Sequence, residues 1–190
     1  MKFSKNLIPK IFLIFITNHI FVNTPKVKSA ENIKIIYSVF SRTVTVESLK
    51  NFAGDENPST KLRRILNATG SSDDEIKSVL NKDFEIPITI ASKLVYSEIG
   101  NIFLSRLSSI LHAPRANDER TGMLALRSSV IQGLYHGNGK INLIKLFENY
   151  PTKTVILNVN ALSKVMNKVE SISELLKFFS SQPLEKIKNN

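Results

Sequence analysis

Few residues in this sequence have the type and spacing that catalysis requires. Ser128 and Ser129 follow Arg127 in an apolar stretch, and His112 and His136 lie on either side of them in the chain. A serine nucleophile needs an activating base and oxyanion donors beside it. In α/β hydrolases it also occupies a Gly-x-Ser-x-Gly elbow, a string that this sequence lacks. We therefore interpret both serines as packing or surface hydroxyls, and we lean toward a protein that is not an enzyme.

The histidines and Arg127 have structural interpretations as well. His112 is expected at a helix end, where a positive side chain complements the dipole. His136 precedes glycine in a predicted turn, and His19 belongs to the N-terminal segment. Arg127 lies among apolar residues, and we expect it to pair with a carboxylate, as buried arginines usually do. Arg127 and His136 remain our only candidates for ligand or interaction contacts, and we predict no catalytic residue.

Metal and cofactor chemistry finds little support. The acidic run 73–75 lacks the spacing of a calcium loop, and consecutive acids on a helix point in different directions. Its carboxylates are better suited to a helix N-terminus. The chain has no cysteine, which excludes disulfides, thiolate metal sites and thiol nucleophiles. It also has no phosphate-binding glycine fingerprint. We predict no metal and no cofactor.

The charge of the chain is unevenly distributed. The formal net charge is +10, and residues 1–30 contain five lysines and no acid, so residues 31–190 carry +5. The remaining basic residues are spread among acids, without the basic, aromatic-interleaved patch that nucleic-acid binding favours. We predict no nucleic-acid partner.

The N-terminus has the features of an export signal. Lys2 and Lys5 precede the apolar run 11–16, and residues 20–22 extend it before Pro25. This stretch is short for a membrane span, which needs about 20 apolar residues. Small residues follow at Ser29 and Ala30, although neither cleavage position fits perfectly. We expect a periplasmic or extracellular protein, which stays membrane-anchored if the signal is not cleaved.

The elements that would position these residues are mostly helical. Residues 33–39 and 43–46 predict a β-hairpin with residues 40–42 between its strands, and residues 154–159 predict a later strand that could join it. Apolar spacing predicts helices over about 46–53, 58–69, 73–81, 87–95, 98–112, 122–135, 141–150 and 160–179. The expected N-caps are Thr45, Asn57, Ser72 with Glu75 in a capping box, and Asn160, and the expected stops include Gly54 and Gly70.

These elements predict a mainly α fold. We expect a multi-helix orthogonal bundle with a small β-hairpin or a three-stranded β element. The predicted organisation is a signal peptide at 1–30, a single helical domain at 31–182 and a disordered tail at 183–190.

Five short stretches of the sequence follow one another in an order that matches a known family pattern. They are Ile36 to Ser38, Arg42 to Leu49 with Phe52-Ala53, Leu94 to Gly100, Ala125 to Arg127, and Leu143 to Phe147 with Tyr150-Pro151. In this order and spacing the chain resembles the DUF1400 family over roughly residues 31–167. That family is the uncharacterised N-terminal domain of secreted α/β-hydrolase-like proteins of photosynthetic bacteria. The resemblance implies a hydrolase domain after this one in larger relatives, but this chain ends at Asn190, so no catalytic role transfers to its residues.

Three functions remain open at this point. The first is an exported, non-catalytic binding or accessory module, whose partner is a separate hydrolase, an envelope protein or an apolar ligand. The second is an esterase- or lipase-related activity, as the family association implies. The third is a membrane-surface protein that contacts lipid through an amphipathic stripe at 162–179. The structure should discriminate among them, because an apolar cavity indicates a ligand and a flat apolar face indicates a partner.

Overall fold

A computed structural model describes residues 29–114, 119–166 and 174 of the chain. Over this part the fold is mainly α with a small β element, as predicted. The helices are α2 (Val46–Ala53), α3 (Thr60–Thr69), α4 (Asp73–Asn81), α5 (Ile88–Val95), α6 (Glu98–Ser108), α7 (Glu119–His136), α8 (Leu143–Glu148) and α9 (Val159–Met166). The strands are β1 (Asn32–Tyr37), β2 (Phe40–Thr45), β3 (Phe84–Glu85), β4 (Leu111–His112), β5 (Lys140–Ile141) and β6 (Thr154–Asn158).

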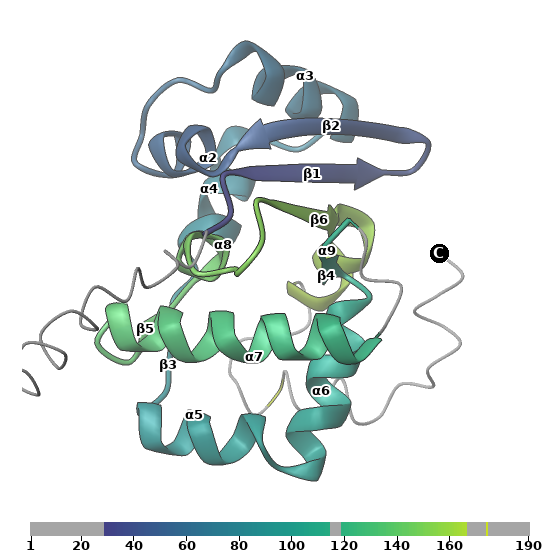
Figure 1. The fold of residues 1–190 in the computed structure, drawn as a ribbon. Helices are drawn as coiled ribbons and strands as arrows, with labels where there is room; N and C mark the ends of the chain where they lie inside the picture. The colour runs from purple at the N-terminus through teal and green to yellow at the C-terminus, as the bar shows by residue number, and fades with distance from the viewer. Residues whose placement is uncertain (1–28, 115–118, 167–173, 175–190) are drawn as a thin grey trace, which may run out of the picture.

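The main sheet joins the first hairpin to the late strand, as the sequence predicts. Its strand order is β2-β1-β6-β4, in which β1 and β6 are parallel and the other pairs are antiparallel. Residues 40–42 lie in β2 instead of between the strands, so Ser38 and Val39 form the turn. The hairpin and α2–α4 form one half of the molecule, α5–α7 form the other, and β6, α8 and α9 lie between them (Figure 1).

The fourth strand of this sheet corrects the prediction of one long helix through His112. Helix α6 ends at Ser108, and Leu111 and His112 form β4, where Leu111 pairs with Leu157. A further backbone hydrogen bond joins the start of β4 to β6, since Asn158 N donates to the Ile110 carbonyl at 2.9 Å. The pairing partner lies far away in the sequence, so the local helical periodicity cannot report it.

Side-chain caps set most of the helix starts. Thr45 accepts from Ser48 N at 3.0 Å, and Ser72 forms the predicted capping box with Glu75. Gly70 adopts φ 66°, the left-handed conformation in which glycine avoids the steric cost of a Cβ. These three caps confirm the sequence assignments.

Two predicted caps are wrong by two residues each. Ser59, not Asn57, accepts from Leu62 N at the start of α3, at 3.3 Å. Asn158, not Asn160, accepts from Ala161 N at 3.1 Å at the start of α9. In the second case β6 passes directly into the helix, which leaves the last strand residue as the cap.

One apolar core runs through the described residues. Its largest fully buried side chains come from both halves of the fold and include Phe52, Phe147, Tyr150, Leu104 and Leu126. No helix in this part of the chain combines the length and the apolar character needed to cross a bilayer. The predicted signal peptide, apart from its last two residues, the predicted tail and most of the stripe 162–179 lie outside the described residues.

Candidate functional site

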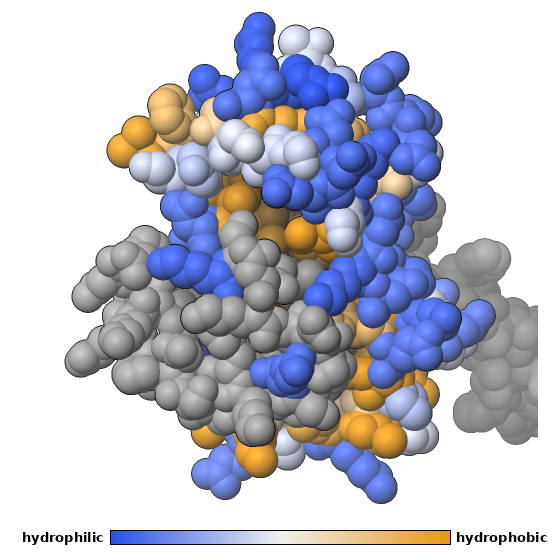
Figure 2. Space-filling model, turned by 180° about the vertical axis from the view of Figure 1, so that it is seen from behind, coloured by the Kyte–Doolittle hydropathy of each residue, from blue (hydrophilic) through white to orange (hydrophobic). Residues whose placement is uncertain are grey.

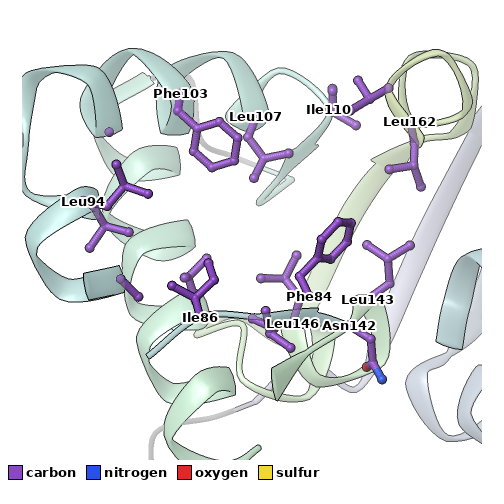
Figure 3. Close-up of a pocket in the computed structure, with 16 residues that line it drawn as sticks. Phe84, Ile86, Leu94, Phe103, Leu107, Ile110, Asn142, Leu143, Leu146 and Leu162 are labelled. Atoms are coloured by element: carbon purple, nitrogen blue, oxygen red, sulfur yellow. The ribbon is translucent and has the colours of Figure 1, made fainter. Parts of the chain in front are cut away.

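An apolar cavity lies between α5–α6 on one side and α8–α9 on the other. Its volume is about 120 Å³. We call it the α5–α9 cavity, and its lining residues are Phe84, Ile86, Ala91, Leu94, Val95, Gly100, Phe103, Leu107, Ile110, Val130, Ile141, Asn142, Leu143, Leu146, Leu162 and Val165. Figure 3 shows the labelled apolar side chains converging on one empty space from all sides.

The lining of the cavity grades from buried to half-buried residues. Ala91, Val95 and Leu146 are buried, whereas Phe103 and Leu107 on α6 are only half-buried. Such a gradient of exposure is typical of a pocket that opens to the surface.

Close backbone contact brings α5 and α6 together as one wall. A Cβ on Gly100 would lie 1.8 Å from the Leu94 carbonyl oxygen, so no other residue fits there without moving the backbone. Ser97 fixes the turn between the helices, because its hydroxyl donates to the Leu94 carbonyl at 2.6 Å and accepts from Gly100 N at 3.0 Å. Contacts among Leu94, Ser97 and Gly100 therefore hold the two helices together as one wall.

The opposite wall is fixed by polar contacts that point away from the cavity. Asn142 caps α8 by accepting from Lys145 N at 3.0 Å, and its amide donates to Asp83 at 2.9 Å. Figure 3 shows the Asn142 amide turned away from the empty space. Among the described residues that line the cavity, Asn142 has the only polar side chain, and both of its polar atoms are occupied. The described lining therefore offers a ligand apolar contact and no hydrogen bond from a side chain.

Arg127 lies behind the α5–α6 wall and is absent from the cavity lining. Its Nε donates to the Val95 carbonyl at 2.8 Å and its Nη2 to Asn101 Oδ1 at 2.6 Å. The guanidinium also lies 4.7 Å from the centre of the Tyr96 ring. The expected carboxylate partner is wrong, since among the described residues its hydrogen-bond partners are a carbonyl and an amide. Arg127 binds the end of α5 and the start of α6 to α7.

The two described histidines are not brought together. His136 is exposed at the end of α7, and its Nδ1 lies 2.8 Å from Asn149 Oδ1. His112 lies in β4, with its Nδ1 3.0 Å from the Ala113 carbonyl. The expected place of His112 at a helix end is therefore wrong, because the helix ends four residues earlier.

The serines of α7 are positioned for packing. Ser129 is fully buried, and its hydroxyl donates to the Leu146 carbonyl at 2.5 Å, which joins α7 to α8. Ser128 is exposed. Seven residues of helix rise separate Ser129 from His136 by about 10 Å along the axis, too far for a hydrogen bond. The described residues also hold no group of three or more histidine, aspartate or glutamate side chains placed to bind a metal.

Sequence reasoning missed the cavity because its residues come from seven elements. Each lining side chain has the ordinary spacing of a core position, and Phe103 and Leu107 read as one stripe of a longer helix. A void appears only when the helices are placed against one another. The stretches that match the family pattern did point to this region, since Leu94 to Gly100 and Leu143 to Leu146 contribute residues to both walls of the cavity.

Comparison with known families gives a match over most of the described residues. The profile of DUF1400, described as an alpha/beta hydrolase of unknown function, matches residues 29–158. Comparison with curated proteins and with solved structures gives no significant match. The matched range covers the hairpin, the α5–α6 wall, α7, α8 and strand β6, which is well over half of the sequence. This chain therefore belongs to the DUF1400 family.

Proposed function

We propose that this protein is an exported, non-catalytic module that binds the apolar part of a ligand in the α5–α9 cavity. The observation that carries the proposal is the cavity itself, at about 120 Å³ with an almost wholly apolar lining. Protein interiors pack densely, so an apolar pocket of this volume is an exception to ordinary packing. A concave pocket with an apolar lining is the kind of site in which proteins bind small apolar ligands.

The size of the cavity defines the ligand class. A dry cavity of roughly 150 Å³ lined by leucine, isoleucine and phenylalanine binds benzene. The α5–α9 cavity is slightly smaller, so it fits a ring or the end of a short acyl chain. Half-buried lining residues such as Leu107 leave the polar end of such a ligand near the surface.

A pair of α7 variants tests the cavity. Val130 lines the cavity and Leu124 is 51 % exposed on the same helix, so Val130→Phe and Leu124→Phe both add a ring, but only the first adds it inside. Benzene, xenon and linear carboxylic acids of increasing length are titrated against the full chain, and the melting temperature is recorded. We expect the wild type and Leu124→Phe to be stabilised by at least one probe, and Val130→Phe to lose the response.

Two results would overturn this proposal. One is the absence of stabilisation by every probe in the wild type. The other is an undiminished response in Val130→Phe, which would place the binding elsewhere. If Val130→Phe folds poorly, Leu107→Phe serves as a second variant, since Leu107 also lines the cavity.

Export is the second part of the proposal. The basic start and apolar run of residues 1–22 support it, and the start of β1 limits where cleavage can occur. Ala30 is buried, and the amides of Glu31 and Asn32 both donate to the Lys153 carbonyl at 3.1 Å. Cleavage after Ser29 keeps this core residue, whereas cleavage after Ala30 removes it. Mass spectrometry of the exported protein should therefore give Ala30 as the first residue, and an intact chain confined to the cytoplasm would contradict export.

An esterase- or lipase-related activity is the second candidate, because the family description names a hydrolase. It requires turnover of short acyl esters by the full chain and loss of that turnover in Ser128→Ala, Ser129→Ala or His136→Ala. The hydroxyl of Ser129 is already bound to a carbonyl, which supports the non-catalytic module. Turnover that depends on any of these residues would replace our proposal with the esterase.

A further inference from the structure

The tip of the β1–β2 hairpin exposes two large apolar side chains. Val39 is 89 % exposed and Phe40 is 55 % exposed, and Ser38 adopts φ 51° in the turn between the strands. Turn positions usually hold polar residues or glycine, because they face water. In Figure 2 the corresponding end of the hairpin carries an orange group beside a largely blue surface. The tip thus presents apolar area to solvent at the most protruding part of the hairpin.

A groove follows the tip, between the hairpin and α3. Its volume is about 160 Å³. Tyr37, Phe40 and Arg42 line it from the hairpin, and Arg64 lines it from α3. Arg42 donates to the neighbouring Ser41 carbonyl at 2.9 Å, and neither guanidinium has a carboxylate partner among the described residues. Two arginines on opposite walls can bind the oxygens of a single anion between them.

The two charged residues that line this groove, Arg42 and Arg64, are both cationic. Elements β1, β2 and α3 contain no aspartate or glutamate, and their cationic residues, all exposed, are Lys34, Arg42, Lys61, Arg63 and Arg64. Arg63 is neutralised by Asp73 of α4 at 2.8 Å. Glu31, which precedes β1, is paired with Lys153 at 3.4 Å. The groove therefore lies in a cationic surface beside an apolar tip.

From this combination we infer that the hairpin tip and the α3 groove form a docking surface for an anionic phospholipid membrane. Val39 and Phe40 enter the boundary between headgroups and acyl chains, and Arg42 and Arg64 bind a headgroup phosphate. Interfacial proteins bind membranes through apolar insertion together with attraction of basic residues to anionic lipid. A nucleic acid would contact the arginines through its phosphates and stack on the aromatic rings, but an exposed valine at the tip would contribute nothing to its binding. This surface is separate from the α5–α9 cavity and does not depend on a ligand there.

Vesicle co-sedimentation of the full chain tests the inference. We expect tighter binding to mixed phosphatidylglycerol–phosphatidylcholine vesicles than to phosphatidylcholine alone, and weaker binding at high salt. Arg42→Gln with Arg64→Gln should weaken this binding by about 25-fold, at roughly fivefold for each basic residue. Val39→Ser with Phe40→Ser should weaken it by about tenfold. All four residues are exposed, so the melting temperature should not change.

The matched control removes the same charge from elsewhere. Lys93 and Lys164 are exposed on α5 and α9, and Lys93→Gln with Lys164→Gln should leave vesicle binding within about twofold of the wild type. An equal loss in this control would overturn the inference, since net charge alone would then explain the binding. No preference for phosphatidylglycerol at low salt would also overturn it. So would displacement from vesicles by inorganic phosphate or by a single-stranded oligonucleotide at an ionic strength at which sodium chloride leaves the protein bound, because the groove would then be a small-anion or nucleic-acid site.

Discussion

Arg127, a candidate ligand contact in the sequence, has a structural role in the fold. It extends from α7 to the last carbonyl of α5 and to Asn101 on α6, at 2.8 and 2.6 Å. A carbonyl at a helix C-terminus lacks an intrahelical partner, and a guanidinium both satisfies it and complements the dipole. The geometry explains why the residue lies in an apolar stretch without a carboxylate. Arg127 holds the α5–α6 wall against α7.

We predict that Arg127→Met destabilises the fold by about 2 kcal/mol, because hydrogen bonds to a charged group are lost and the Val95 carbonyl loses its donor. Arg127→Lys should recover little of this, since one ammonium cannot reproduce the fork that reaches two acceptors. Chemical denaturation measures both changes. Arg64 is exposed and has no ion pair with the described residues, so Arg64→Met should stay within about 0.5 kcal/mol of the wild type. Full rescue by lysine would contradict the proposed geometry.

At the scale of elements, helices α5 and α6 act as a single unit that covers the cavity. Their contact depends on the missing side chain of Gly100, which allows the Leu94 carbonyl to approach. Ser97 adds its two hydrogen bonds at the turn between them. The unit carries Leu94, Phe103 and Leu107 to the cavity, so any displacement of it changes the volume available to a ligand.

We predict that Gly100→Ala is strongly destabilising, by about 3 kcal/mol or more, because the new Cβ meets backbone atoms that cannot rotate away. The melting temperature and the benzene response of the cavity should fall together. Gly54→Ala is the matched control, since its Cβ would have only ordinary contacts at 3.5 Å and its φ of −86° suits any residue. A neutral Gly100→Ala would show that α5 and α6 are not packed as described.

At the scale of the whole molecule, Tyr150 makes the free energy of unfolding depend on pH in the alkaline range. It is fully buried, and its hydroxyl has no hydrogen-bond partner among the described residues. Burial raises the pKa of the Tyr150 phenol to about 12, because the charged form is poorly solvated in the core. The folded state therefore retains this proton at pH values where the unfolded chain has lost it.

The sign of the pH effect follows from this difference. Between the ordinary pKa of about 10 and the folded value, the native state binds more protons, so the free energy of unfolding falls as pH rises. Tyr150→Phe should remove this part of the alkaline slope. It should also stabilise the fold by about 1 kcal/mol at neutral pH, since the unpaired hydroxyl is gone. Urea denaturation of both proteins across the alkaline range tests this, and identical slopes would contradict it.

The sequence by itself determined the local structure of this protein. Thr45, Ser72 and Gly70 set helix ends through contacts within a few residues, and alternating residues set the hairpin and β6. Such features depend on short-range periodicity and capping, so the mainly α class and the family resemblance were accessible from the amino-acid order. Asn158 was missed as a cap because the strand and the helix meet without a loop.

Only the tertiary structure decided the strand β4, the partners of Arg127 and the existence of the cavity. Leu111 becomes a strand residue because β6 offers it backbone donors and acceptors. Arg127 bonds a carbonyl and an amide because the α5–α6 turn, about thirty residues earlier, is folded onto α7. The cavity is the space that seven elements leave unfilled between them, so it cannot be predicted from any single segment. Non-local packing created the candidate site, whereas local patterns created the elements that surround it.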